Sequence, residues 1–455
     1  MPGSIVAALG RHARERPGAI ALVHGDRRVG YQELSGLPVA VDGVVVPALK
    51  TPETVALIAA HLAARRPFLL VSPELGEDTA AVLREHMATW TPDEDVSFVL
   101  TTSGSTGVPK VVPLGFDAVE RFTDWAVAQF GIGPGTAVLN YAPFTFDLCL
   151  LDVWATLKAG GTAVLVDPKR ATDAKHVASL LRDNGVEVVQ AVPMLFRLLL
   201  DAWDGTPFDR VRHVVLTGDK TSAPLLIRLP GMFPTAAIHN VYGCTETNDS
   251  FLHTVPPGEP PPRDLPIGRP LPGVDALIAP DGGETPFTVD GTPATGELLV
   301  RTPFQTTGYL DPADSAGRFT RVPGRTGTYF RSGDIVRRDA DGVHHLLGRN
   351  DFQVKVRGTR INLEEVERVL LDHDAVLEAA VVGLPDDLAG TRLHAVVRGV
   401  GLDGLALRAH CRRRLPRVAI PSGLHVVHEP LPRTSTGKVD RQRIRRTALE
   451  GTDHE

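Results

Sequence analysis

Apolar residues along the chain follow two patterns that alternate from one segment to the next. Short apolar runs rich in β-branched residues predict buried strands, and longer stretches with apolar residues every three or four positions predict helices. The predicted strands are residues 19–23, 44–46, 68–71, 96–100, 160–166, 186–189, 211–216, 376–382 and 394–397. The predicted helices are residues 5–16, 51–64, 116–130, 172–184, 194–202, 363–371 and 405–415. Strands that alternate with helices predict a parallel sheet with helices on its faces.

Two later regions follow a different pattern. Residues 274–330 combine strand signals with Gly, Pro and Asp turns, and this combination predicts a β-rich subdomain. Residues 255–264 are rich in proline and predict a surface connector before it. The last ~100 residues contain both helix and strand patterns and have the size of a small α+β domain. The fold class that we expect is α/β, with a large N-terminal domain of several subdomains and a small C-terminal domain.

Composition and charge narrow the class of protein. A chain of 455 residues is too long for one core, so we expect two or three domains. The net charge of −6 argues against a nucleic acid as partner, and no apolar run reaches the ~18 residues of a membrane span. The first residues lack the basic segment of a signal peptide, and the three cysteines lack the spacing of a metal site or disulfide framework. We therefore expect a cytoplasmic protein without a membrane partner.

A stretch of small residues directly follows the strand pattern that ends near Leu100. Thr101 to Gly107 offers backbone N–H groups, hydroxyls and glycines, which can surround phosphate oxygens, and Lys110 can pair with the phosphate charge. The stretch fails the Walker A pattern, because Pro109 replaces the second glycine and Val111 replaces the hydroxyl residue after the lysine. A flexible linker is the alternative, although a linker rarely follows a strand directly.

The stretch resembles the phosphate loop of the adenylate-forming superfamily, which comprises acyl-CoA synthetases, adenylation domains of nonribosomal peptide synthetases and luciferases. The superfamily pattern is [ST]SG[ST]TGxPKG, and the match covers Thr102 to Lys110, with Val111 in place of the last glycine. The segment between Leu34 and this loop is short for the superfamily, so we expect a trimmed N-terminal subdomain. The resemblance implies an ATP phosphate site formed by Thr102, Ser103, Gly104, Ser105, Thr106, Gly107 and Lys110.

A second motif, Asn240 to Glu246, resembles the superfamily pattern [NH]xYGxTE, and an ordinary surface turn is the alternative. The resemblance implies that Tyr242 faces adenine, that the Thr245 hydroxyl bonds the α-phosphate and that Glu246 supplies an oxygen for Mg²⁺. Tyr329 to Asp334 resembles the pattern Y[RK]TGD, whose aspartate accepts hydrogen bonds from both ribose hydroxyls. The remaining ATP-binding residues that the resemblance implies are Gly218, Asn240, Gly243 and Arg349.

Asp147 lies inside an apolar run, where an unpaired acid is costly. Two interpretations of this residue are open. It is either a structural acid that caps a helix or pairs with a nearby group, or a ligand of the substrate. Phe146-Asp147 resembles the Phe-Asp pair of amino-acid-activating members, in particular stand-alone D-alanyl carrier protein ligases, and this resemblance implies an aspartate that binds the substrate's α-ammonium group. By the same analogy the substrate pocket is lined by Leu148, Leu151, Gln190, Val215, Thr217, Val241, Asp249 and Ser250. Asp249 suggests a substrate with a small, polar or amino-bearing side chain.

The longest match, Gly348 to Glu367, resembles GRxDxQVKxRGxRI…E[IV]E of peptide-synthetase members. The resemblance implies a boundary between domains 1–349 and 350–455, a hinge at Asp351 and a loop near Gly358 that meets the carrier arm after the small domain rotates. Pro432 to Arg441 resembles P[RK]Tx[NS]GKxDR, which makes Lys438 the catalytic lysine that bridges a carboxylate and a phosphate. With Lys438, we expect Glu246, Thr245 and Lys110 to be catalytic.

The resemblance implies an enzyme that uses ATP and Mg²⁺ to adenylate an amino acid and then transfers it to the phosphopantetheine thiol of a separate carrier protein, as in nonribosomal peptide synthesis. The chain ends soon after Lys438, so we expect no fused carrier domain. Basic clusters at residues 412–414 and 441–446 are read as solvated helix faces or as a dock for an acidic carrier. A CoA ligase for a small acid and an inactive binding or scaffold relative remain as alternatives.

Overall fold

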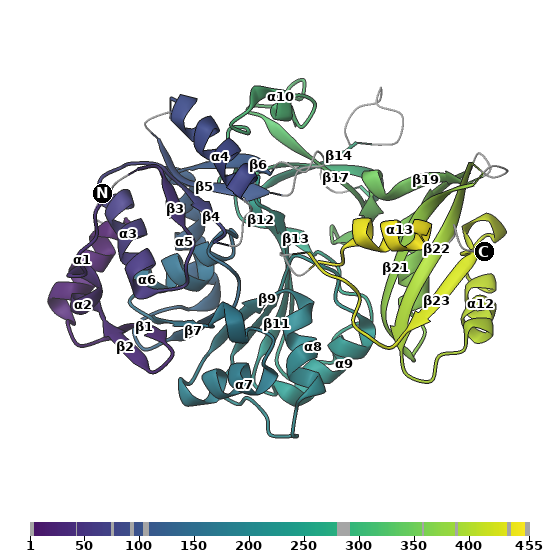
Figure 1. Cartoon of the computed structure of the whole chain (residues 1–455), viewed down its shortest axis with the longest axis horizontal. Coiled ribbons are helices and arrows are strands. Elements are labelled where there is room, and N and C mark those ends of the chain that lie inside the picture. Colours follow the sequence, from purple (N-terminus) through teal and green to yellow (C-terminus); the bar gives the residue numbers. More distant parts are fainter. Residues whose placement is uncertain are drawn as a thin grey trace.

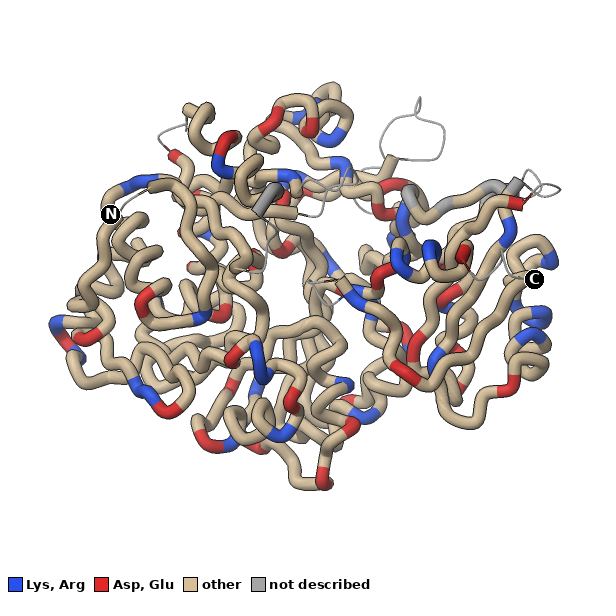
Figure 2. The backbone as a smooth tube through the Cα atoms, viewed as in Figure 1, with Lys and Arg blue, Asp and Glu red and all other residues tan. Residues whose placement is uncertain are grey.

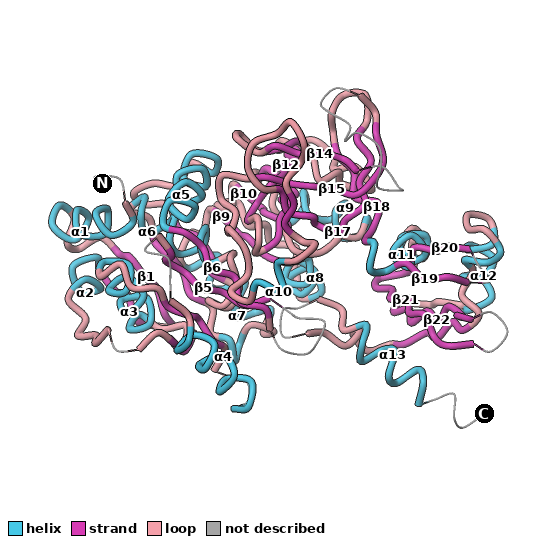
Figure 3. The backbone as a smooth tube through the Cα atoms, turned by 90° about the horizontal axis from the view of Figure 1, so that it is seen from above, coloured by secondary structure: helices cyan, strands magenta, loops and turns pink. Residues whose placement is uncertain are grey.

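The computed structural model describes residues 4–41, 43–73, 77–91, 95–102, 109–279, 292–356, 359–386, 390–434 and 438–450. For residues 77, 78, 351, 353, 355, 359, 360 and 390 it describes the backbone alone. Figure 1 and Figure 3 show a larger body that contains the elements up to β18 and a smaller body that contains β19 to α13. This arrangement confirms the expected α/β fold with a large and a small domain.

A nine-stranded sheet organises the larger body, in the order β13-β12-β11-β10-β9-β7-β8-β1-β2. The pairs from β1 through β8, β7, β9 and β10 to β11 are parallel, and β2, β12 and β13 add antiparallel edges. The strands are β1 (Ile20–His24), β2 (Arg27–Gly30), β7 (Ala137–Asn140), β8 (Thr162–Leu165), β9 (Val188–Ala191), β10 (His213–Leu216), β11 (Ala237–Cys244), β12 (Asn248–Val255) and β13 (Arg269–Pro270).

A second sheet of four strands carries the predicted phosphate loop between its last two strands. Its order is β3-β4-β5-β6, and β5 and β6 pair antiparallel with Thr102 opposite Lys110. Its strands are β3 (Val45–Pro47), β4 (Phe68–Val71), β5 (Val96–Thr102) and β6 (Lys110–Gly115). Residues 103–108, which hold most of the predicted phosphate loop, lie outside the described residues.

Helices cover both faces of the nine-stranded sheet. One face packs against α7, α8 and α9, and the other packs against a layer that includes η1, α5 and α6 and that also contacts the four-stranded sheet. The helices are α1 (Ile5–Glu15), α2 (Tyr31–Ser35), α3 (Pro52–Ala63), α4 (Glu77–Thr89), α5 (Phe116–Phe130), η1 (Leu150–Ala155), α6 (Thr156–Ala159), η2 (Pro168–Arg170), α7 (Ala174–Asp183), α8 (Pro193–Asp201) and α9 (Ala223–Met232). Thr51 caps α3 by accepting a hydrogen bond from the Thr54 amide.

The predicted β-rich subdomain is a third sheet, β14-β15-β17-β16 with β18 paired to β17. Its elements are β14 (Asp275–Ala279), β15 (Ala294–Arg301), α10 (Pro312–Ser315), β16 (Phe319–Thr320), β17 (Tyr329–Arg338) and β18 (His344–Arg349). The smaller body contains a hairpin and a three-stranded sheet with helices around them. Its elements are η3 (Asn350–Phe352), β19 (Gln353–Val356), β20 (Thr359–Asn362), α11 (Leu363–Leu371), β21 (Val376–Asp386), β22 (Gly390–Gly399), α12 (Gly404–Arg412), η4 (Arg417–Ala419), β23 (Gly423–Val427) and α13 (Arg441–Glu450).

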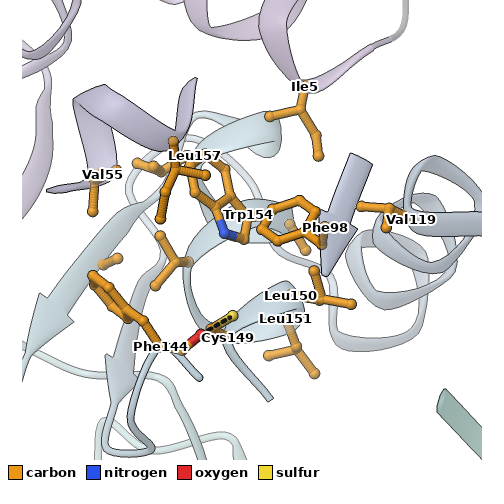
Figure 4. Packing of buried hydrophobic residues seen from close by; sticks show 14 of the residues in the cluster. Ile5, Val55, Phe98, Val119, Phe144, Cys149, Leu150, Leu151, Trp154 and Leu157 are labelled. Carbon is orange, nitrogen blue, oxygen red and sulfur yellow. Dashed lines mark hydrogen bonds between the residues drawn. The ribbon is translucent and has the colours of Figure 1, made fainter. Parts of the chain in front are cut away.

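The segment that follows β7 is buried in the larger core. Residues 150–155 are all buried and form a π-helix, which the apolar pattern of the sequence did not predict. Figure 4 shows Trp154 between Phe98 and Leu157, and it shows the hydrogen bond from Cys149 Sγ to the Phe144 carbonyl (3.5 Å). This packing holds the bend from Phe144 to Cys149, and Asp147 lies within that bend.

Candidate active site

Polar residues gather at the carboxyl ends of the parallel strands, where ligands bind in open α/β sheets. Asn140 of β7 lies opposite Gln190 of β9, which in turn lies opposite Val215 of β10. Leu216 at the end of β10 lies opposite Asn240 of β11. The sheet therefore brings the predicted motifs around residues 147, 217 and 240–246 to one edge.

Asp334 receives two side-chain hydrogen bonds from predicted ATP-binding residues. The Tyr242 hydroxyl donates to Oδ2, and Arg349 Nη1 donates to Oδ1 at 2.8 Å. Arg349 is also the register partner of Asp334 across β17 and β18, and the Asp334 amide donates to Ser332 Oγ at 3.0 Å. Burial and the Asp334 charge raise the pKa of Tyr242 well above its usual value, so its hydroxyl keeps its proton. The predicted adenine and ribose residues thus lie side by side.

The turn between β11 and β12 presents Thr245 and Glu246 and requires a glycine. A Cβ at Gly243 would lie 2.2 Å from the Asn248 carbonyl oxygen. Because this oxygen belongs to the backbone, it cannot move aside, and only glycine fits here. Asn248 itself has a positive φ of 56°, a region that asparagine tolerates better than most residues. The side-chain amide of Asn240 donates a hydrogen bond to the Pro266 carbonyl (2.8 Å). Gly218 has a positive φ of 79°. Gly218 and Gly243 shape the backbone at this edge.

Glu246 is buried and held by Tyr309. The Tyr309 hydroxyl donates to Glu246 Oε1 at 2.5 Å, and the Thr306 amide donates to the Glu246 carbonyl at 2.9 Å. Lys110 lies on the other side of Tyr309, with Nζ 4.8 Å from the ring centroid and 3.0 Å from Asp314 Oδ1. The structure therefore connects the predicted phosphate lysine and the predicted Mg²⁺ carboxylate through one tyrosine.

Asp147 faces the charged groups of this edge. Burial and the nearby Glu246 charge raise its pKa to about 6, and the positive charge of Lys438 acts in the opposite direction. Burial and the charge of Asp147 raise the pKa of Asp249 to about 8. The interactions place Asp147 within electrostatic reach of Asp249, Glu246 and Lys438, although the four residues come from distant parts of the chain.

Lys438 belongs to a hairpin of the smaller body that extends toward the larger body (Figure 1, yellow segment before α13). Arg433 pairs with Val439 across this hairpin, and the Thr434 amide donates to the Lys438 carbonyl at 2.8 Å. Glu378 holds the base of the hairpin through Arg433 and through the Leu431 amide (3.2 Å). The Lys438 side chain is exposed, so it is available to a ligand.

Several predicted pocket residues have their polar atoms engaged within the protein. Gln190 Nε2 donates to the Leu148 carbonyl (3.1 Å) and to Asp152 Oδ1 (3.0 Å), so this amide fixes the loop that carries Asp147. The Ser250 hydroxyl donates to Thr247 Oγ1 (3.1 Å). Leu148 and Asp249 are partly exposed, whereas the other predicted lining residues are buried, namely Leu151, Val215, Thr217 and Val241. Among the predicted lining residues, Asp147, Leu148 and Asp249 have exposed surface.

Sequence reasoning missed the buried network under this loop. Lys50 is 5% exposed and donates to the carbonyls of Asn140 (2.8 Å) and Tyr141 (3.1 Å). Asp152 is fully buried and accepts from Asn140 Nδ2 (3.3 Å) as well as from Gln190. Burial lowers the pKa of Lys50 to about 7, and the Asp152 charge opposes this shift. Lys50 directly precedes the N-cap of α3, and nothing in the sequence around it indicated that this lysine would be buried.

We expect Lys50→Met to lower the free energy of unfolding by about 3 kcal/mol, because it removes the cation near Asp152 and the lysine's hydrogen bonds to two backbone carbonyls. Urea denaturation measures the change. The matched control is Lys169→Met, since Lys169 is exposed on the same body. A loss no larger than that of the control would contradict the structural role of Lys50.

The structure describes no side chain for two residues that are predicted to serve the transfer to the carrier, the hinge residue Asp351 and the loop residue Gly358. Asp351 lies in η3, and only its backbone is described; Gly358 lies outside the described residues. Among the described residues no group of three or more His, Cys, Asp or Glu side chains could hold a metal ion. A single carboxylate such as that of Glu246 is sufficient for Mg²⁺, because this ion usually keeps waters and phosphate oxygens as its other ligands. In the described part of the chain no helix has the length and apolar character of a membrane span.

Comparison with known proteins matches both parts of the chain. The profile of the family described as AMP-binding enzyme matches residues 40–310, and that of the AMP-binding enzyme C-terminal domain matches residues 365–438. Tyrocidine synthase 3 of Brevibacillus parabrevis is 32% identical over 354 residues, which are 77% of this chain but 5% of that protein. An L-proline--[L-prolyl-carrier protein] ligase of Pseudomonas fluorescens is 32% identical over 76% of this chain and 68% of its own length. Klebsiella oxytoca NpsA, solved with 3-hydroxyanthranilyl-AMSN, has a TM-score of 0.81 at 22% identity and covers 98% of this chain and 99% of its own.

Proposed function

Because the chain belongs to the family of AMP-binding, adenylate-forming enzymes, we propose that it activates an amino acid with ATP and transfers it to the phosphopantetheine thiol of a separate carrier protein. The observation that carries this proposal is the position of Asp147 within reach of Glu246 and Lys438. A partly buried carboxylate at this place binds an ammonium group more readily than the tail of a simple acid. The carrier-protein ligases among the relatives support the same acceptor.

In the first half-reaction the amino acid carboxylate attacks the α-phosphorus of ATP, and pyrophosphate leaves. The reaction brings an anion toward a polyanion, so its barrier is mainly electrostatic. Lys438 bridges the carboxylate and the α-phosphate, Thr245 bonds the α-phosphate, and Lys110 neutralises the departing phosphates. Because the nucleophile is already ionised, the reaction requires no general base. Tyr242 and Asp334 hold the adenosine.

Mg²⁺, when bound at Glu246 and the phosphates, supplies positive charge to the triphosphate. In the second half-reaction the small domain rotates about Asp351, Lys438 leaves, and the segment at Gly358 approaches the thiol. The carrier thiolate then attacks the acyl carbon of the aminoacyl-adenylate, a thioester forms, and AMP leaves. Such a rotation keeps water from the reactive anhydride. The domain boundary at residues 349 and 350 follows from the same hinge. For the pocket we propose an amino acid with a small, polar or amino-bearing side chain, because the carboxylate of Asp249 lies within electrostatic reach of Asp147.

The two basic clusters are candidate contacts for the carrier. Arg412 to Arg414 are exposed at the end of α12, whereas Arg441 donates to both carboxylate oxygens of Glu367 (3.0 and 2.6 Å). Figure 2 shows Lys and Arg interspersed with Asp and Glu over the backbone. We propose the exposed arginines of both clusters as contacts for an acidic carrier, and we leave out Arg441 because it is paired with Glu367 within the small domain.

The test is ATP–pyrophosphate exchange across L-, D- and β-amino acids and simple carboxylic acids. Exchange with one amino acid would support the proposal and name the substrate. Exchange with simple acids alone would contradict the role of Asp147 and favour a CoA ligase. A complete absence of exchange would favour an inactive relative.

A further inference from the structure

One segment outside the predicted motifs joins the two groups that are expected to meet the triphosphate. This bridging segment, residues 306–315, lies between β15 and β16 and contains α10. The Thr306 hydroxyl donates to the Pro113 carbonyl (2.6 Å), and the Leu310 amide donates to the Val111 carbonyl (2.9 Å). The segment is therefore bonded to β6, the strand that begins with Lys110.

The same segment is bonded to the turn that carries Glu246. The Thr306 amide donates to the Glu246 carbonyl, and the Tyr309 hydroxyl donates to Glu246 Oε1. The Tyr309 hydroxyl therefore fixes one carboxylate oxygen of Glu246. Tyr309 is itself positioned by Ser315, whose hydroxyl accepts from the Tyr309 amide at 2.9 Å, and its side chain is 8% exposed. Its orientation is thus set by packing and by hydrogen bonds at both ends.

Lys110 contacts the segment at two points. Its ammonium lies over the Tyr309 ring and within 3.0 Å of Asp314, and both Lys110 and Asp314 are partly exposed. In this position the lysine charge is neutralised by a carboxylate of the protein. A triphosphate that pairs with Lys110 must compete with that carboxylate, whereas the Tyr309 ring can keep its contact with the ammonium.

We propose that Tyr309 and Asp314 are positioning residues of the ATP site: Tyr309 orients Glu246 toward Mg²⁺, and Asp314 holds Lys110 until the triphosphate displaces it. The inference rests on the proposed function, because it assumes that Lys110 and Glu246 serve ATP and Mg²⁺. It makes separate predictions for the two residues. Tyr309 affects the metal-dependent part of nucleotide binding, and Asp314 affects the part that depends on the lysine charge.

We expect Asp314→Asn to bind α,β-methylene-ATP, a nonhydrolysable analogue, roughly two- to five-fold more tightly than the unsubstituted protein, with or without Mg²⁺, since an exposed ion pair contributes little and is lost on binding. Calorimetry measures the affinity. Asp311→Asn is the matched control, because it removes a charge three residues away while asparagine still caps α10. In a Lys110→Ala background the effect of Asp314→Asn should vanish. Unchanged or weaker binding by Asp314→Asn would overturn this part.

We expect Tyr309→Phe to weaken binding of the analogue roughly ten-fold with Mg²⁺ present and to leave binding in EDTA unchanged, because the ring stays and the hydrogen bond to the carboxylate is lost. Tyr329→Phe is the control, since it removes another buried hydroxyl that donates to a carboxylate, that of Asp275. Equal losses with Mg²⁺ and in EDTA would overturn the metal-orienting role. If the unsubstituted protein binds no analogue, the proposed function fails as well; if it binds and both variants match it, the inference alone fails.

Discussion

Lys438→Ala is expected to lower amino-acid-dependent ATP–pyrophosphate exchange by about a hundred- to a thousand-fold, which is the usual cost of removing one donor that stabilises developing charge. The structure gives the reason. The positive charge of Lys438 acts on Asp147 from the other body of the chain, and in the proposed mechanism this cation bridges the substrate carboxylate and the α-phosphate. With this cation removed, carboxylate and phosphate would meet without compensating charge.

The decisive contrast is between the two half-reactions. When the aminoacyl-adenylate is supplied preformed, Lys438→Ala should transfer the aminoacyl group to the carrier thiol at nearly the unsubstituted rate, because the lysine leaves before that step. Lys169→Ala, an exposed lysine of the larger body, is the control and should retain both activities. Equal losses in both half-reactions would argue for a structural role of Lys438, as would a lowered Tm.

The sequence predicted the elements well where one pattern dominated. The helix at 116–130 and the start of the helix at 363 agree with the structure, because an apolar face repeats there without competing signals. The π-helix at residues 150–155 was missed, since its residues are buried on every side and show no period. The trimmed N-terminal subdomain and the hinge at Asp351 remain predictions.

For the site, short motifs predicted which chemistry-bearing residues gather, and the structure adds how they are held. Tyr242, Asp334 and Arg349 come from separate motifs and form one hydrogen-bonded group. Lys50 and Asp314 could not be predicted, because their roles depend on partners that are distant in sequence, Asn140 and Lys110. Gln190 remains a predicted pocket residue, and the structure adds that its amide nitrogen donates to Leu148 and Asp152.

Asp147→Asn is expected to lower kcat/KM for the amino acid by about a hundred-fold or more, since hydrogen bonds between charged groups are among the strongest that proteins make. The KM for ATP should change little. In the unsubstituted enzyme, kcat/KM for the amino acid should rise as pH increases through about 6, where Asp147 ionises, and Asp147→Asn should lack this step. A variant that keeps both the amino acid KM and the pH step would contradict the role of Asp147.

The same carboxylate should lower the stability of the ligand-free protein. The folded-state pKa values of Asp147 and Asp249, about 6 and about 8, lie above the ordinary aspartate pKa of 3.8, so the folded chain binds more protons than the unfolded chain. Their contribution to stability is therefore present at pH below 3.8 and is lost as pH rises through about 6 and about 8. At pH 8 Asp147→Asn should raise the Tm measured by calorimetry, because it removes a partly buried charge and its repulsion with Glu246 and Asp249. Saturating substrate should reverse this order, since the α-ammonium group stabilises only the protein that retains the carboxylate.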